Sequence, residues 1–406
     1  MSTRPIDAIL GKMPGMNKWR KDFFRHILQL FLSMRGRHNF ENMERYGTYN
    51  ECSYRQNFEK PFDFAHFNRE LIDQVCGPVR IAAFDPCYLS KSGKHTPGVG
   101  WHWSGSAGKA KWGLEIGGLA VVDVFNNTAM HLQSSLTPDA AWLKEENITL
   151  LEHYAQLVYF NKEHLAALNV QHLVVDAYFA KHPFISKILE DTHLNVITRL
   201  RSDIVLRYRY LGPVSKGKGR PKSFDGTVDA HNPDPRHFNI CCEQPGLRLY
   251  EGVVHCKAFK RWLKVVLMHE TDKDGQVQRV KIFASTDLDL PANDIFKFYK
   301  SRFQIEFLFR DAKGHTGLEH CQSRNEARMN FHHNLSLTAV SVAKALHWYS
   351  LDAQSRRAFS IEDIKAQHFN ELMLERFFCV FGSAADPLKN HPDICQIINF
   401  GVKAAA

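Results

Sequence analysis

Hydrophobic residues follow a helical spacing in the first part of the chain and a strand spacing from about residue 79 onward. The segment 18–34 predicts a helix whose buried face comprises Phe23, Ile27, Leu30, Phe31 and Met34. Gly36 follows as a stop signal. Residues 1–75 are therefore predicted to be helical, and small helices carrying arginine and aromatic residues suit a DNA groove. A packing region without a nucleic-acid role is the alternative.

The central part of the chain alternates between the two spacings. Buried strands are predicted over 79–85, 172–179 and 194–200, a hairpin over 114–136 with an Asn126-Asn127 turn, and helices over 137–168 and 182–190. The order is strand, hairpin, helix, strand, helix and strand. Such an order predicts an α/β fold with a mixed sheet flanked by helices.

Two of the predicted strands carry an aspartate behind a hydrophobic run. Asp85 follows VRIAAF, and Asp176 follows HLVV. An ionised carboxylate is costly inside a core, whereas the carboxyl ends of strands form the rim where ligands of open α/β sheets bind. Asp85 and Asp176 are therefore candidate site residues at the edge of the sheet.

Residues 203–285 interrupt the alternation with several strand-like segments, which predict a β-rich insertion. The loop at 215–223 alternates glycine or proline with four cations, Lys216, Lys218, Arg220 and Lys222. A flexible basic loop can follow a phosphate backbone, so these four residues are candidate DNA contacts. A flexible surface linker is the alternative.

The pattern becomes helical again after Pro291. Helices are predicted over 293–314, 325–350 and 360–381, the last beginning at the capping-box-like pair Ser360 and Asp363. Five parts follow from the whole pattern: a helical region with a predicted DNA-binding role (1–75), the first part of the α/β core (76–202), the β-rich insertion (203–285), the second part of the core (286–350) and a C-terminal helical region (351–406).

A run of chemically matched side chains lies on the predicted helix 293–314. Tyr299, Arg302, Glu306 and Lys313 fall near one stripe of a continuous helix, and Arg310 lies one turn after Glu306. One carboxylate among cationic and hydroxyl donors suits a site that holds a metal ion and a phosphodiester together. A solvent-facing salt-bridge ladder of Glu306 with Arg302 and Arg310 is the alternative.

Composition narrows the class of protein. The 406 residues carry a net charge of +9, and the pI near 9.0 favours a polyanionic partner, of which DNA is the leading candidate. A solvated basic face is the alternative. The nine cysteines form no CxxC pair, so reduced thiols are expected rather than zinc ligands. The sequence shows no membrane-spanning apolar run and no secretory signal, which predicts a cytoplasmic protein.

The stripe also carries a resemblance to a known family. From Tyr299 to Lys313 the chain reads Y-KS-R-FQI-E-FLFRDA-K, which resembles the Tyr, Arg, Glu, Lys signature of the DDE transposases of the insertion-sequence-four family, with every spacing met. FDPCYLSKSGKHTPG and VVDAYFAK resemble the family's first and second aspartate segments. Pro86 departs from the Gly, Ser or Thr that many members carry after the first aspartate.

The resemblance implies an RNase H-like core in which Asp85, Asp176 and Glu306 converge and bind two Mg²⁺ or Mn²⁺ ions. It implies cut-and-paste DNA transposition: metal-dependent strand cleavage at the ends of an insertion sequence, then strand transfer. The implied partners are the inverted-repeat ends and target DNA, bound by a homodimer in a paired-end complex. A bacterial cytoplasmic protein, associated with the nucleoid when bound, is expected.

Two alternatives keep the same fold. A domesticated or inactive member would bind DNA without cleaving it, and an RNase H-like nuclease would cleave without strand transfer. The complete acidic triad weighs against the first alternative, and the Tyr-Arg-Glu-Lys signature weighs against the second. A scaffold protein unrelated to nucleic acid is disfavoured by the charge pattern.

Overall fold

The computed structural model describes residues 4–213, 221–273, 275–349, 351, 359–380 and 391–402. The chain forms two compact units. Unit 1 comprises residues 1–78, 86–143 and 305–406, and unit 2 comprises residues 79–85 and 144–304. The strand β1 (Arg80–Ser90) contributes its first residues to unit 2 and its later residues to unit 1.

The N-terminal part of unit 1 is helical, as predicted. Its helices are α1 (Arg4–Lys12), α2 (Lys18–Ser33), α3 (Phe40–Tyr46), α4 (Glu51–Glu59) and α5 (Phe64–Val75). Asn17, Asn39, Asn50 and Asp63 cap α2 to α5 by accepting backbone N–H groups of the first turn. The predicted apolar face of α2 is fully confirmed, because all five of its residues are buried.

Arg20 of α2 has a structural role within this helical region. Its guanidinium donates to the backbone oxygens of Asn57 and Lys60 at 3.0 and 2.9 Å. Burial lowers the pKa of Arg20 to about 10. This arginine therefore fixes the end of α4 on α2, and its donors face protein rather than solvent.

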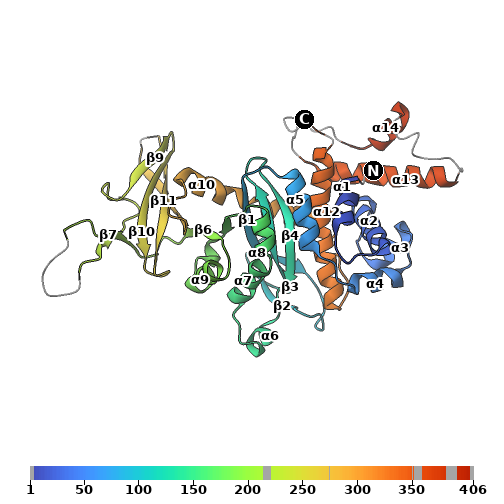
Figure 1. Cartoon of the computed structure of the whole chain (residues 1–406), viewed down its shortest axis with the longest axis horizontal. Coiled ribbons are helices and arrows are strands. Elements are labelled where there is room, and N and C mark those ends of the chain that lie inside the picture. Colours follow the sequence, from blue (N-terminus) through green and yellow to red (C-terminus); the bar gives the residue numbers. More distant parts are fainter. Residues whose placement is uncertain are drawn as a thin grey trace. The chain divides into compact units, whose positions relative to one another are not determined.

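The helix α12 (Glu326–Tyr349) is the central element of unit 1, and nearly all of its length is buried. It packs against α2, α4, α5 and the strand β4 (Thr128–Leu136) (Figure 1). Its polar side chains are satisfied there: Asn334 bonds the backbone of Ser134, and the Lys344 ammonium donates to Ala129 O at 2.8 Å. A helix that is apolar on all sides is expected in such a position. The remaining helices of unit 1 are α11 (Gln304–His315), which begins at the unit boundary, α13 (Ile361–Val380) and α14 (Pro392–Ile398).

The predicted hairpin of unit 1 is present and longer than expected. β3 (Lys109–Asp123) pairs with β4 in antiparallel register, and β2 (Gly100–Ser104) pairs with the start of β3. The turn contains Asn127 at a positive φ of 49°. The Asp123 carboxylate accepts the backbone N–H groups of Phe125 and Asn126, so this aspartate stabilises the turn together with the asparagines.

Unit 2 contains a mixed sheet, which agrees with the predicted α/β class. Its strand order is β1-β5-β6-β12-β11-β10-β7-β8, with β9 paired to β10. β1, β5 and β6 are parallel, and the pairs β6/β12, β12/β11 and β11/β10 are antiparallel. The strands are β5 (His172–Val175), β6 (Asn195–Leu200), β7 (Leu206–Arg209), β8 (Phe224–Thr227), β9 (Asn239–Gln244), β10 (Leu247–Cys256), β11 (Arg261–Thr271) and β12 (Val277–Ser285).

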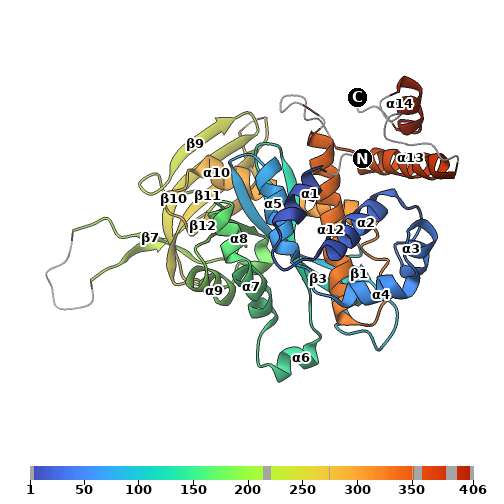
Figure 2. The same cartoon turned by 45° about the vertical axis from the view of Figure 1, so that its right-hand side comes forward.

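Helices pack on the sheet of unit 2. They are α7 (Leu150–Phe160), α8 (Lys162–Ala167), the 3₁₀ helix η1 (Ala177–Phe179), α9 (His182–Asp191) and α10 (Ala292–Ser301). α9 packs against α7 and β6, and α10 packs against β6, β11 and β12 (Figures 1 and 2). A mixed sheet with helices on its faces is consistent with an RNase H-like fold.

Three predicted elements differ from the observed ones. The helix predicted over 137–168 is divided into α6 (Ala140–Glu145), α7 and α8, with Asn147 at a positive φ of 53° and Asn161 between α7 and α8. The strand predicted over 172–179 ends at Val175, because Asp176 caps η1 by accepting Tyr178 N–H at 2.9 Å. The helix predicted over 293–314 is interrupted at Arg302 and Phe303, where Phe303 N–H bonds Lys300 O in a tighter turn.

Within the described part of the chain, no helix has the length and apolar character needed to cross a membrane.

Candidate active site

Asp85 lies on β1, and Asp176 directly follows β5, the parallel strand that pairs with β1. The register pairs Ala82 with Leu173 and Ala83 with Val174, a constant offset of 91 residues. These pairs end two residues before Asp85 and Asp176, and the same offset (176 − 85 = 91), continued along the chain, sets Asp85 level with Asp176, which directly follows β5. Paired residues on neighbouring strands lie about 5 Å apart and point to the same face of a sheet. The two aspartates that the sequence singled out are therefore neighbours at the carboxyl edge of unit 2.

The same row continues across two further strands. β5 and β6 pair Val175 with Thr198, so the next position sets Asp176 beside Arg199. β6 and β12 then pair Arg199 with Phe283. One face of the sheet thus presents two carboxylates, a guanidinium and an aromatic ring in sequence.

Local hydrogen bonds fix the position of Asp176. Its carboxylate accepts Tyr178 N–H at 2.9 Å, and its carbonyl accepts the Thr198 hydroxyl at 2.9 Å. The strand therefore ends at this aspartate, and its side chain lies at the start of a turn rather than inside the core. Asp85 and Asp176 are both half-buried. Pro86 causes no loss of pairing with β5, because β5 has already ended at Val175.

Tyr299 of α10 and Arg302, which directly follows α10, supply hydrogen-bond donors at this face of the sheet. The Tyr299 ring packs against Phe283, with ring centroids 4.9 Å apart. Burial raises the pKa of the Tyr299 hydroxyl, and the charges of Arg302 and Arg199 oppose that rise. Arg302 Nη1 lies 3.6 Å from Asp85 Oδ1. Arg302 thus lies beside Asp85, and Tyr299 lies close enough to Asp176 for that charge to raise the pKa of its hydroxyl.

A cavity of ≈ 270 Å³ opens beside these residues in unit 2. Four cationic and four aromatic side chains line it, namely Arg199, Lys281, Lys300 and Arg302 with Phe283, Phe296, Tyr299 and Phe303. Lys281 also contacts Glu270 Oε1 at 2.6 Å. The lining combines positive charge with ring faces, which suits an anionic or nucleotide-like group.

Sequence reasoning missed Arg199 as a site residue. It is the exposed position of β6, where the neighbouring residues Thr198 and Leu200 are buried. The signal in the sequence is that Arg199 is a lone arginine in an otherwise apolar strand. The position across from it is one of the candidate aspartates. Its recognition requires the register between β5 and β6, which the sequence alone does not fix.

The other residues of the stripe lie in unit 1. Glu306 is in the first turn of α11 and is half-buried. Lys313 donates to Tyr88 O at 2.6 Å and lies 3.4 Å from Glu319 Oε1. Arg310 is exposed and pairs with Asp311 at 3.0 Å. The stripe is thus divided between two helices and does not form one face of a continuous helix, which corrects the geometry predicted for it.

The basic loop of 215–223 is described only in part. Lys216, Lys218 and Arg220 lie outside the described residues. Lys222 Nζ lies 3.2 Å from Asp225 Oδ1 and 4.9 Å from the centroid of the Tyr210 ring. Lys91, a further basic residue after Asp85, donates to Cys321 O and Ser323 O, and burial lowers its pKa.

The donor chemistry of the site favours hard cations. Across the described residues, no group of three or more His, Cys, Asp or Glu side chains is gathered so that it could hold a metal ion. Among the described residues, no cysteine forms a disulfide bond. Asp85 and Asp176 nevertheless follow adjacent parallel strands, and Arg302 is a counter-charge for Asp85. Neighbouring carboxylates repel each other, and a divalent cation with a preference for oxygen ligands relieves that repulsion.

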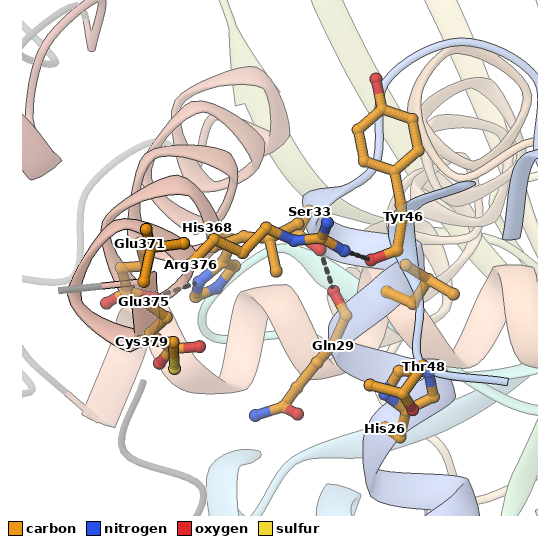
Figure 3. A pocket seen from close by; sticks show the side chains of 13 residues that line it. His26, Gln29, Ser33, Tyr46, Thr48, His368, Glu371, Glu375, Arg376 and Cys379 are labelled. Atoms are coloured by element: carbon orange, nitrogen blue, oxygen red, sulfur yellow. Dashed lines mark hydrogen bonds and ion pairs between the residues drawn. The ribbon is translucent and has the colours of Figure 1, made fainter. Parts of the chain in front are cut away.

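A larger cavity of ≈ 700 Å³ lies in unit 1, between α2 and α13 (Figure 3). Its lining includes the acidic pair Glu371 and Glu375, and Glu371 accepts from His368 Nδ1 at 2.9 Å. Arg376 bonds the Tyr46 carbonyl across it. Neither aspartate of the sheet edge lines this cavity, and its carboxylates disfavour a phosphate group.

Two known protein families match the chain. Residues 13–237, more than half of the chain, match the DDE superfamily endonucleases. Residues 148–341 match the transposase DDE domain. The chain therefore belongs to the DDE superfamily of endonucleases and transposases, whose members act on DNA and typically use divalent metal ions. No curated protein matches the chain in a sequence comparison.

Proposed function

We propose that this protein is a transposase of the insertion-sequence-four type, which cleaves DNA at the ends of a mobile element and joins the freed 3′ ends to target DNA. The observation that carries the proposal is that Asp85 and Asp176 follow the paired residues of two adjacent parallel strands at the same offset, with Arg302 3.6 Å from Asp85. Family membership supports DNA as the substrate and phosphodiester cleavage as the reaction.

Asp85, Asp176 and Glu306 are the proposed ligands of two Mg²⁺ or Mn²⁺ ions. The carboxylates at the sheet edge fit such ions, because carboxylate oxygens are hard ligands. Bound divalent ions would supply Lewis acidity toward the attacking oxygen and the leaving 3′-oxygen. The contribution of the chain is to place the carboxylates on rigid strand and helix ends.

Chain geometry supports the participation of Glu306. It follows Arg302 by only four residues in the chain and is the carboxylate of the Tyr-Arg-Glu-Lys signature. Because Arg302 reaches Asp85, the first turn of α11 starts close in the chain to the sheet-edge site. We propose that this turn delivers the third carboxylate.

The cationic and hydroxyl groups of the site orient the DNA. Tyr299 and Arg302 are proposed to bind phosphate oxygens at the cleaved end, and Arg199 extends this positive surface along the same face. Lys313, Arg310, Lys222 and the loop residues Lys216, Lys218 and Arg220 are proposed as further backbone contacts. Such contacts fix the DNA in register without reading its sequence.

The proposed partners are the inverted-repeat ends and the target DNA, and the proposed assembly is a homodimer on paired ends. We propose that the helical region 1–75 binds DNA and that the β-rich region 203–285 is an insertion in the RNase H-like core. A protein that only binds DNA and a nuclease without strand transfer are the competing functions. The intact carboxylate pair disfavours the first of them.

The test is the variant Glu306→Gln, assayed on duplex DNA that carries the inverted repeats flanking the gene. Cleavage and strand transfer in Mg²⁺ are expected for the wild type. The variant should lose cleavage by at least about a hundredfold while its affinity for the same DNA stays within about threefold. Asp203→Asn, which changes an exposed carboxylate in unit 2, is the matched control and should cleave normally. Near-normal cleavage by Glu306→Gln would reject the assignment.

A further inference from the structure

The β2–β3 hairpin carries three tryptophans on one face. Trp101 and Trp103 lie two residues apart on β2, so their side chains share a face. Trp112 lies directly opposite Trp101 on β3, with ring centroids 6.0 Å apart in an edge-to-face arrangement. We call residues Gly100–Gly113 the tryptophan hairpin.

These rings are unusually exposed. The relative exposure of Trp101 is 71%, that of Trp103 is 63% and that of Trp112 is 39%. Tryptophan is highly buried on average, and an exposed cluster of large apolar side chains marks an interaction surface. The proposed catalytic residues include none of these tryptophans, so the cluster is a separate feature that needs a ligand.

The lysines and acidic residues of the hairpin's own sequence are unevenly distributed. Between Asp85 and Glu115 the sequence contains four lysines and no acidic residue. Lys94, Lys109 and Lys111 are exposed. Lys109 and Lys111 pair with Ser104 and His102 and so point to the other face of the hairpin, whereas Trp112 Nε1 donates to Gly93 O at 3.1 Å and brings the segment with Lys94 to the tryptophan face. Aromatic faces beside a cation form the kind of surface on which proteins stack the bases of single strands while holding their phosphates.

The hairpin is connected to the helix that carries Glu306 by contacts inside unit 1. The Tyr88 hydroxyl donates to Trp112 O at 2.7 Å, and the Lys111 ammonium lies 5.6 Å from the centroid of the Tyr88 ring. Lys313 of α11 donates to Tyr88 O at 2.6 Å. Tyr88 therefore joins the base of the hairpin to α11.

We propose that the tryptophan hairpin is a stacking platform for unpaired DNA bases. Trp101 and Trp103 would stack on successive bases, and Lys94, which follows the Gly93 carbonyl bonded by Trp112, would neutralise an adjoining phosphate. The ligand is thus single-stranded or locally opened DNA, as arises where strands are cut and exchanged. The inference rests on the proposed function in taking DNA as the ligand, and it adds a binding site outside the carboxylate cluster.

The test measures binding without catalysis. A fluorescein-labelled oligothymidine of about 20 nucleotides and a duplex of equal length are titrated with the full-length protein in EDTA, and anisotropy is recorded. Trp101→Ala/Trp103→Ala should weaken single-strand binding by about fivefold to a hundredfold per stacked base and leave duplex binding nearly unchanged. Trp101→Phe/Trp103→Phe keeps the rings and should restore most of the affinity.

Controls separate stacking from folding. Trp142→Ala removes an exposed tryptophan on α6 and should leave single-strand binding unchanged. Trp103 lies opposite Ala110, so Trp103→Ala preserves the Trp101–Trp112 pair and replaces the double variant if that variant unfolds. Lys94→Gln should weaken binding of the single strand and reduce its salt dependence, and Lys109→Gln, on the other face of the hairpin, is its control.

Unchanged single-strand affinity in the folded alanine variants would overturn the proposal. The proposal would also be overturned if the alanine variants lost the wild type's binding to phosphatidylcholine–phosphatidylserine vesicles but kept its DNA affinity. The hairpin would then bind a membrane surface. The outcome is independent of the catalytic assignment. A wild type that binds single strands through the tryptophans yet never cleaves DNA defeats the proposed function alone.

Discussion

Arg302 Nη1 lies 3.6 Å from Asp85 Oδ1, so a guanidinium stands beside one of the two neighbouring aspartates of the sheet edge. The Arg302 side chain is only 12% exposed, and a charge at that depth is stabilised by its partner. The same arginine ends α10 just before the turn that leads to α11. It thus relates the first aspartate to the start of the helix that carries Glu306.

Replacing Arg302 should weaken DNA binding in the cleavage reaction. Arg302→Ala removes a planar donor set and should raise the KM for DNA by about tenfold to a hundredfold, the range for one charge-assisted contact. Arg302→Lys keeps the positive charge but loses the planar guanidinium, so its KM for DNA should lie between those of Arg302→Ala and the wild type. Steady-state cleavage at several DNA concentrations measures this. An unchanged KM in Arg302→Ala would remove Arg302 from the DNA-binding set.

Divalent ions should stabilise the wild type more than a carboxylate variant. A ligand that binds the native state raises the unfolding temperature by mass action. Addition of Mn²⁺ should therefore raise Tm in the wild type, and Asp85→Asn should lose most of that rise. Asp203→Asn is the control and should respond like the wild type. Equal shifts in all three proteins would show that Asp85 does not bind the ion.

Neutralising Arg199 should reduce the salt dependence of DNA binding. Each phosphate contact releases counterions, so the slope of log K against log salt should fall by about one in Arg199→Gln. Arg236→Gln is a useful control, because Arg236 already pairs with Asp234 at 2.6 Å and its charge is compensated. Binding isotherms at several salt concentrations give both slopes. Identical slopes for Arg199→Gln and the wild type would contradict the role given to this residue.

Acid should destabilise the protein through histidines buried as neutral rings. Burial lowers the pKa of His131 to about 4, and its ring contacts Asn334 Oδ1 at 3.0 Å. The pKa of His131 is near 6.5 in the unfolded chain and about 4 in the folded protein. The free energy of unfolding therefore falls as the pH decreases from about 6.5 to about 4. His131→Gln should make that decrease shallower by up to about 1.4 kcal/mol per pH unit.

Urea unfolding of wild type and His131→Gln across the same pH range measures this effect. His95→Gln alters an exposed ring and should leave the pH dependence as it is in the wild type. Parallel curves for wild type and His131→Gln would show that protonation of His131 is not linked to unfolding.

Local hydrophobic patterns predicted much of the architecture. The apolar face of α2, the strands before Asp85 and Asp176, and the hairpin at Asn126-Asn127 depend on spacing within one segment, and they are present in the structure. Asp85 and Asp176 were found for the same reason. An acid that directly follows a buried strand is visible without knowledge of strand order.

Features that depend on pairing or on local turns could not be predicted in the same way. Arg199 joins the site only because β6 lies beside β5 in a particular register. The helix predicted over 293–314 is interrupted at Arg302, where Phe303 N–H bonds Lys300 O in a tighter turn. The hydrophobic pattern of 293–314 is nevertheless helical throughout. The exposure of Trp101 and Trp103 depends on the pairing of β2 with β3, and β2 was not predicted as a strand.

The burial of α12 among α2, α4, α5 and β4 has a consequence for shortened forms of the protein. A product that stops before Glu326 would expose the apolar surfaces of those elements and leave the backbone of Ser134 and Ala129 without the side chains of Asn334 and Lys344. The N-terminal helices therefore do not constitute a self-sufficient fold. Translation must reach the end of α12 before the region that begins the chain can mature.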